Sequence, residues 1–188
     1  MLGQTLLFLL DVLVQPFAAV LLFRFHAVWL HVPMRNPVGE FLMAITDFAV
    51  LRARRFVPRI SGLDSATLLL AFLVELVYLV LFMWLQSFPF EPFPLLGVLV
   101  WTAVKLLKIS IYLLIATLIV EAILSWVNPH TPLAPMLSAV NRPFLLPLRR
   151  RIPLVGGVDL SVLLLLIICQ LILIAPIGGL EQFALSLL

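Results

Sequence analysis

The sequence predicts an all-α membrane protein with four transmembrane helices, and three observations support this prediction. Hydrophobic residues make up 64% of the 188-residue chain and charged residues 11%, whereas soluble domains average about 45–50% and about 25%. Four apolar stretches reach the roughly 20 residues with which a helix crosses a bilayer. Two of these stretches are followed by basic segments that resemble each other. Lipid is therefore the expected solvent for most of the chain.

The first span is expected at about residues 6–29, with Asp11 and Arg24 inside it. The chain start lacks the positive region of a secretory signal, so we expect this span to be retained. A basic link of about 30 residues follows. Its segment 38–56 has an apolar residue on each helical turn, which is typical of a helix lying in the membrane interface. These residues are Phe41, Ile45 and Phe48.

The second span is expected at about residues 65–86, and the proline- and phenylalanine-rich segment 86–95 then favours a tight hairpin at the membrane surface. The third span, about 95–126, is long enough to require tilt or an interfacial start. The fourth is expected at about 160–177. Prolines interrupt the second basic link, so its helix should be shorter than that of the first link. They are Pro135, Pro143 and Pro147.

The distribution of basic residues predicts the topology. Nine of the twelve lysines and arginines fall in the two links between spans one and two and between spans three and four. Both links lie on one side of the bilayer, because two spans separate them. The positive-inside rule places that side in the cytoplasm and both termini in the periplasm. No nucleic-acid-binding motif accompanies the net charge of +3, so we expect no nucleic-acid partner.

An internal repeat relates the two halves, which we take as units 1–90 and 91–188. A shift of 95 positions (149 − 54 = 95) aligns six pairs of identical proline, arginine, glycine and aspartate residues without a gap. Each unit then consists of a helix, a basic interfacial segment and a second helix, and both units have the same orientation. The identical pairs are Pro37 and Pro132, Arg54 and Arg149, Arg55 and Arg150, Pro58 and Pro153, Gly62 and Gly157, and Asp64 and Asp159.

A string of residues in the second unit resembles the YggT family of bacterial membrane proteins, whose chloroplast relatives are often called YlmG-like. The string contains Leu124-Ser125-Trp126, Asn128-Pro129, Arg142-Pro143, Pro147, Arg149-Arg150, Pro153 and Gly156-Gly157-Val158-Asp159-Leu160-Ser161. The first unit departs from it at Leu30-His31, Asp47-Phe48 and Ser65-Ala66. The resemblance implies a small inner-membrane protein. Relatives are associated with osmotic or ion homeostasis, cell division, nucleoid or chloroplast organisation, and cytochrome maturation.

Arginines of the two links are the candidate binding residues. They could hold anionic lipid phosphates, acidic groups of a partner protein, or both. We name Arg54, Arg55, Arg142, Arg149, Arg150 and Arg151. Asp64 and Asp159 stand immediately before the second and fourth spans, where each should cap the helix or pair with a nearby arginine. The Gly156–Gly157 pair suits a tight turn before Asp159.

Charged and polar residues inside the spans are functional candidates by default. Asp11 lies at a depth similar to that of Lys105 and Lys108, so we hypothesise that it pairs with one of them. Glu75, Gln170 and Glu121 could form hydrogen bonds between helices or line an ion path. The shift of 95 places Glu75 opposite Gln170.

These features favour a non-enzymatic inner-membrane scaffold or assembly factor over an enzyme, because the sequence shows no nucleotide loop or catalytic triad. The alternative is an ion channel or a channel-modulating subunit. Four helices leave little room for a pore, so conduction would need a homo-oligomer. We expect no cofactor and no metal. The expected partners are anionic phospholipid and an unidentified membrane or cytoplasmic protein.

Overall fold

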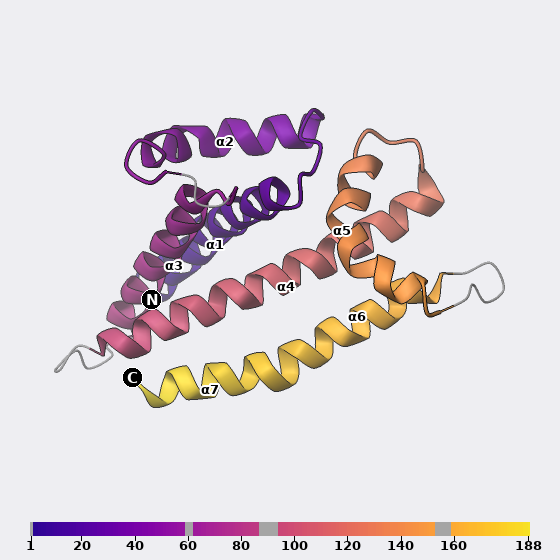
Figure 1. Cartoon of the computed structure of the whole chain (residues 1–188). Helices are drawn as coiled ribbons and strands as arrows, with labels where there is room; N and C mark the ends of the chain where they lie inside the picture. Colours follow the sequence, from indigo (N-terminus) through magenta and orange to yellow (C-terminus); the bar gives the residue numbers. More distant parts are fainter. Residues whose placement is uncertain (1, 59–61, 87–93, 153–158) are drawn as a thin grey trace.

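The computed structural model describes residues 2–58, 62–86, 94–152 and 159–188, and these ranges contain no β-strand. The helices, drawn in Figure 1, are α1 (Leu2–Trp29), α2 (Pro37–Ala53), α3 (Ser65–Leu85), α4 (Leu95–Val127), α5 (Ala134–Arg149), α6 (Leu160–Ile172), the π-helix η1 (Leu173–Ile177) and α7 (Gly178–Ser186). The all-helical prediction is confirmed. The hairpin expected between the second and third spans falls on residues 87–93, outside the described ranges.

Four helices are long and apolar enough to cross a membrane, in agreement with the predicted spans. The second and third keep the predicted bounds to within a residue. The fourth is longer than expected, because α6, η1 and α7 form one helical rod from Leu160 to Ser186. Pro176 does not end this rod, since it lies in the π-turn, where the backbone hydrogen bonding is already altered.

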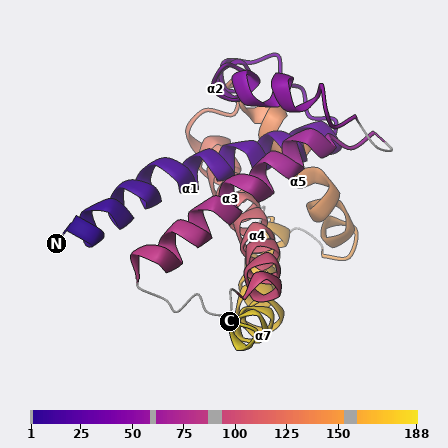
Figure 2. The same ribbon diagram turned by 90° about the vertical axis from the view of Figure 1, so that its left-hand side faces the viewer.

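The spans form two antiparallel pairs that meet along α4. Contacts join α1 to α3, α3 to α4, and α4 to α7. In Figure 1, α4 runs between the α1–α3 pair and the last span, and both chain ends lie away from α2 and α5. Figure 2 shows α1 and α3 side by side, with α4 and α7 seen nearly end-on below them. We call the end of the molecule that carries α2 and α5 the link side.

Helix α2 forms where the sequence predicts an interfacial helix. The Asn36 side chain caps it by accepting from the Gly39 amide at 2.9 Å, and Pro37 occupies its first turn. Gly39 is required here, because a Cβ would lie 2.2 Å from the Met34 carbonyl oxygen. The helix buries Leu42 and Val50 and leaves Phe41 and Phe48 exposed.

The helix of the second link is shorter than that of the first, as predicted, but by only one residue, since α5 has 16 residues and α2 has 17. Pro135 falls in the first turn of α5, where a backbone N–H has no helical partner to lose. Pro143 and Pro147 are four residues apart and both exposed, so the missing hydrogen bonds fall on one face of the helix.

Three apolar clusters hold these elements together. One joins α1, α3 and α4, and includes Leu21, Leu22, Ala71 and Leu106. A second lies below the link helices and joins the end of α1 to α2 and α5. The third joins α4, α5 and α6 through Leu118, Leu145, Leu165 and Cys169. The outward faces of the spans are rich in exposed leucine, isoleucine, valine and phenylalanine, as expected of lipid-facing surfaces.

Candidate functional site

An arginine–aspartate ion pair occurs at the same register in both halves of the chain. Arg54 donates to Asp64 through Nη2 at 2.5 Å and through Nε at 3.3 Å. Arg149 donates to Asp159 through Nε at 2.7 Å. Ten residues separate the partners in each pair, and the pairs are 95 positions apart (149 − 54 and 159 − 64). Each pair ties the end of a link helix to the start of the span that follows it.

The two pairs differ in exposure. The Asp64 side chain is 0% exposed and that of Arg54 is 25% exposed, whereas Asp159 and Arg149 are 28% and 45% exposed. Asp64 also accepts from the Thr67 hydroxyl at 2.6 Å, and its side chain makes no capping bond to the α3 backbone. Asp159 does cap α6, through the Ser161 amide at 3.0 Å. Thus both aspartates pair with arginine as expected, and Asp159 also caps its helix.

The pKa of the Asp159 carboxyl is lowered from its ordinary value. Partial burial would raise this pKa, but hydrogen bonds from Arg149 and from Ser161 favour the charged form and outweigh burial. The carboxylate is therefore charged at neutral pH. The hydroxyl of Ser161 is buried and makes no hydrogen bond within the described residues.

A second polar contact also repeats between the halves. Asn141 in α5 donates to Glu121 Oε2 at 2.6 Å and accepts from the Thr117 hydroxyl at 2.8 Å. The equivalent residue of the first half is Thr46 in α2 (141 − 46 = 95). Thr46 accepts from Arg24 at 2.5 Å, and Arg24 also pairs with Asp47 at 2.7 Å. In both halves a buried side chain thus fastens the link helix to the preceding span.

A groove opens between α4 and α6 beside the second ion pair. Its volume is about 430 Å³. Five residues named from the sequence line it: Glu121, Ser125, Trp126, Arg149 and Asp159. Trp126 stands at its rim with 88% of its surface exposed. A smaller cavity on the α5 side shares Glu121 and Ser125 and includes Pro129. Asn128 ends α4, and its amide donates to the Leu124 carbonyl.

The remaining candidate arginines are exposed on the link side. They form no ion pair with the described part of the chain, and they are Arg55, Arg142, Arg150 and Arg151. Two of the six arginines named from the sequence, Arg54 and Arg149, are instead engaged by aspartates. The glycine pair Gly156–Gly157 lies outside the described residues.

A polar network lies within the spans of the first half and α4. Glu75 is 0% exposed, pairs with Lys105 at 3.0 Å and accepts from Gln15 at 3.2 Å. The Lys105 ammonium lies 4.3 Å from the centre of the Tyr78 ring. The hypothesis that Asp11 pairs with Lys105 or Lys108 is wrong, because the Tyr78 hydroxyl donates to Asp11 and each lysine has another carboxylate.

The other intramembrane charges meet between α4 and the last span. Lys108 lies 2.7 Å from Glu181 Oε1 and 2.9 Å from Oε2, so the extension of the fourth span beyond Ile177 supplies its partner. The Gln170 side chain does not join any network, since the residue is exposed and its side chain makes no hydrogen bond to the described residues. The repeat aligns Gln170 with Glu75 in sequence, but the two side chains therefore have different environments and do not share a role.

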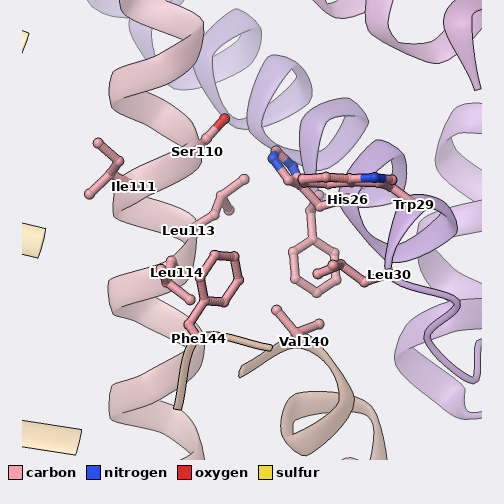
Figure 3. A pocket seen from close by; sticks show the side chains of 10 residues that line it. His26, Trp29, Leu30, Ser110, Ile111, Leu113, Leu114, Val140 and Phe144 are labelled. Atoms are coloured by element: carbon pink, nitrogen blue, oxygen red, sulfur yellow. The ribbon is translucent and has the colours of Figure 1, made fainter. Parts of the chain in front are cut away.

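An apolar pocket of about 240 Å³ lies between the two halves. Figure 3 shows His26 and Trp29 of α1, and Leu30 just after this helix, facing Leu113 and Leu114 of α4, with Phe144 of α5 closing one side. The polar atoms here are engaged by backbone carbonyls: His26 Nδ1 lies 2.6 Å from the Leu22 oxygen, and Ser110 donates to Leu106. This pocket suits an apolar chain and offers little for chemistry.

Sequence reasoning missed several residues of these contacts, among them Arg24 as a partner of α2, Thr46, Tyr78, Asn141 and Glu181. A signal was present for two of them, because the shift of 95 aligns Thr46 with Asn141 as polar residues inside otherwise apolar helix faces. Tyr78 follows Glu75 by three residues and so shares its face of α3, which could have placed it in the same network.

Comparison with known proteins supports the resemblance. A family model described as CCB3/YggT matches residues 3–85 and 100–180. The Escherichia coli (strain K12) protein named "Uncharacterized protein YggT" is 32% identical over 173 residues, which cover 90% of this chain and 87% of the relative. The Vibrio alginolyticus "Uncharacterized protein in proC 3'region" is 33% identical over 168 residues, covering 85% and 86%. No solved structure matches.

Proposed function

The chain belongs to the CCB3/YggT family, and we propose that it is a non-enzymatic scaffold of the bacterial inner membrane. In this proposal the link side faces the cytoplasm and binds anionic phospholipid and a partner protein, while both termini lie in the periplasm. The four apolar spans fix the position of that face. The proposal includes a role in assembling or organising other proteins.

One observation carries the proposal: the four exposed candidate arginines lie on the link side without an ion-pair partner in the described chain, and so do Arg35 and Arg52. An arginine near an anionic leaflet contributes about 1 kcal/mol of attraction. Because Arg54 and Arg149 are engaged by Asp64 and Asp159, the attraction falls on Arg55, Arg142, Arg150 and Arg151. The guanidinium group also binds carboxylates in two-point geometry, which suits an acidic partner surface.

The test compares two sets of substitutions at these four arginines. One replaces all four by glutamate, and its matched control replaces all four by lysine and so keeps the charge. Proteins cross-linked to the chain in intact membranes are quantified for each. We expect partner yield to fall at least about tenfold with glutamate and to be largely retained with lysine. Protease accessibility checks that both sets insert normally. Partner yields unchanged by glutamate would contradict the proposal.

The second candidate function is an ion channel or a subunit that modulates one. The observation that favours it is Glu75, whose Oε2 is buried and has no hydrogen-bond partner within the described residues. An oxygen of this kind in a span is a candidate cation ligand. The opposing observation is that Glu75 is paired with Lys105 and Lys108 with Glu181, so these four intramembrane charges compensate one another.

Ion flux through purified protein in liposomes separates the two functions. Flux carried by the wild-type chain and abolished by Glu75→Gln would favour the channel. Gln170→Ala is the matched control, because this residue is exposed at the equivalent position of the other half. We expect no flux of sodium, potassium or protons above protein-free liposomes for any of the three proteins.

A further inference from the structure

The groove between α4 and α6 changes character along its length. At the link side its walls are polar and charged, through Ser125, Arg149 and Asp159. Further along the spans its walls are apolar, through Leu118 and Leu166. On α4 the lining extends from Trp126 to Leu118, eight residues that correspond to about 12 Å of helix. A ligand that fills this groove must therefore have a polar end at the membrane surface and an apolar end inside.

The charged residues that line the groove determine which polar headgroup a ligand can have. The lining contains one arginine and two carboxylates, Arg149, Asp159 and Glu121. Arg149 uses Nε for Asp159, so its terminal nitrogens remain available as donors. Glu121 uses Oε2 to accept from Asn141, and its Oε1 makes no hydrogen bond within the described residues. The groove thus offers a cationic donor and an anionic acceptor together, with one negative charge in excess.

We propose that this groove binds a phospholipid with a primary-amine headgroup, of the phosphatidylethanolamine class. The phosphate accepts from Arg149 and the ammonium donates to Glu121, while one acyl chain lies along Leu118, Val162 and Leu166. An anionic headgroup without an amine leaves Glu121 unmatched. A choline headgroup carries the charge but has no N–H to donate. The exposed ring of Trp126 at the rim suits the headgroup depth, where tryptophan is favoured.

This lipid is distinct from the lipid of the proposed function. The proposed scaffold face uses the exposed arginines Arg55, Arg142, Arg150 and Arg151 and selects negative charge. The groove selects a zwitterion through Glu121 and Arg149. The experiment on partner capture by the exposed arginines and the experiment on headgroup selection by the groove can therefore refute their proposals independently.

Trp126 provides the reporter for the test. Substituting the other three tryptophans (Trp29→Phe, Trp84→Phe and Trp101→Phe) leaves Trp126 as the single fluorophore. The protein is reconstituted in vesicles of unbrominated phosphatidylcholine that contain increasing fractions of brominated phosphatidylethanolamine, and in the reciprocal mixture. Bromine quenches tryptophan on contact, so the quenching curves give the relative affinity of the groove. We expect about a tenfold preference for phosphatidylethanolamine.

Two variants and a control assign the preference to the groove. Glu121→Gln keeps a carbonyl oxygen for Asn141 but loses the charge, and should abolish the preference for phosphatidylethanolamine. Ala122→Phe fills the groove and should weaken quenching by every brominated lipid. Glu40→Gln, an exposed carboxylate on α2, should keep the full preference. Equal quenching by both lipids, an unchanged preference in Glu121→Gln, or stronger quenching by brominated phosphatidylglycerol would each overturn the proposal.

Discussion

The two halves of the molecule carry the same arginine–aspartate pair, yet one pair is enclosed and the other is open. In the first half Asp64 is fully buried and receives two bonds from Arg54 and one from Thr67. In the second half Asp159 and Arg149 share a single bond and stand at a groove. The same motif is thus enclosed by the fold in one copy and stands at an open groove in the other.

The surroundings of the pairs explain this difference. The positions equivalent to Glu121 and Ser125 are His26 and Leu30 in the first half (121 − 26 = 125 − 30 = 95). His26 and Leu30 line the apolar pocket of Figure 3, where α4 and α5 of the second half cover them. Glu121 and Ser125 line the groove between α4 and α6. At the face that contacts the second half, the first half thus has a histidine and a leucine in place of the glutamate and the serine.

The largest effect should come from removing the enclosed aspartate. Asp64→Ala leaves Arg54 without its partner next to a buried position, which costs about 3 kcal/mol of unfolding free energy. The matched change Asp159→Ala should cost about 1 kcal/mol, because that pair is partly exposed and mainly a helix cap is lost. Unfolding by sodium dodecyl sulfate in mixed micelles measures both. Equal costs would show that the difference in exposure has no energetic consequence.

A smaller loss of stability should follow from removing the polar contacts that join each link helix to the span before it. Asn141→Ala removes two buried hydrogen bonds and leaves Glu121 and Thr117 without them, at a cost of about 2 kcal/mol. Thr46→Ala should cost about 1 kcal/mol, since Arg24 keeps its ion pair with Asp47. The same unfolding assay compares the two variants. A larger loss from Thr46→Ala would reverse the assignment of the stronger contact to the second half.

The smallest effect should appear as a dependence on pH. The pKa of Asp159 is lowered on folding, so its contribution to stability is complete above its ordinary pKa of 3.8. It is lost as the pH falls through the lowered value. Wild type should therefore exceed Asp159→Asn in stability at pH 6 by less than about 1 kcal/mol, and the gap should close in strong acid. A gap that widened on acidification would contradict the direction of the shift.

Much of the fold could be predicted because it depends on periodicity and on helix ends. The spans follow from apolar runs, and the position of Asp64 and Asp159 before a span predicts a cap or a pair with a nearby arginine. The structure adds which arginines these are, Arg54 and Arg149. The length of helix α5 was harder to predict, because a helix tolerates a proline or not depending on the face that the proline occupies. The length of a helix with prolines is therefore decided by its surroundings.

The candidate site was predicted less well than the fold, because its geometry depends on helix rotation. Matching depth and opposite charge suggested an ion pair between Asp11 and a lysine. The rotation of the helices about their axes instead brings Lys105 to Glu75 and turns Asp11 toward Tyr78. The same cause separates Glu75 from Gln170, which points outward. Depth in a span can be read from sequence position, whereas the direction of a side chain is set by the packing of all neighbouring helices.

The π-turn at Leu173–Ile177 has a consequence for how the halves correspond. Such a turn holds one residue more than an α-helical turn, so every later residue is rotated by about 100° relative to a regular helix. That phase advance brings Glu181 to the side of α7 that meets Lys108. It also means that the sequence offset of 95 positions can keep the fourth span in helical phase with α3 only up to Leu173, and that one further position must be skipped after Ile177.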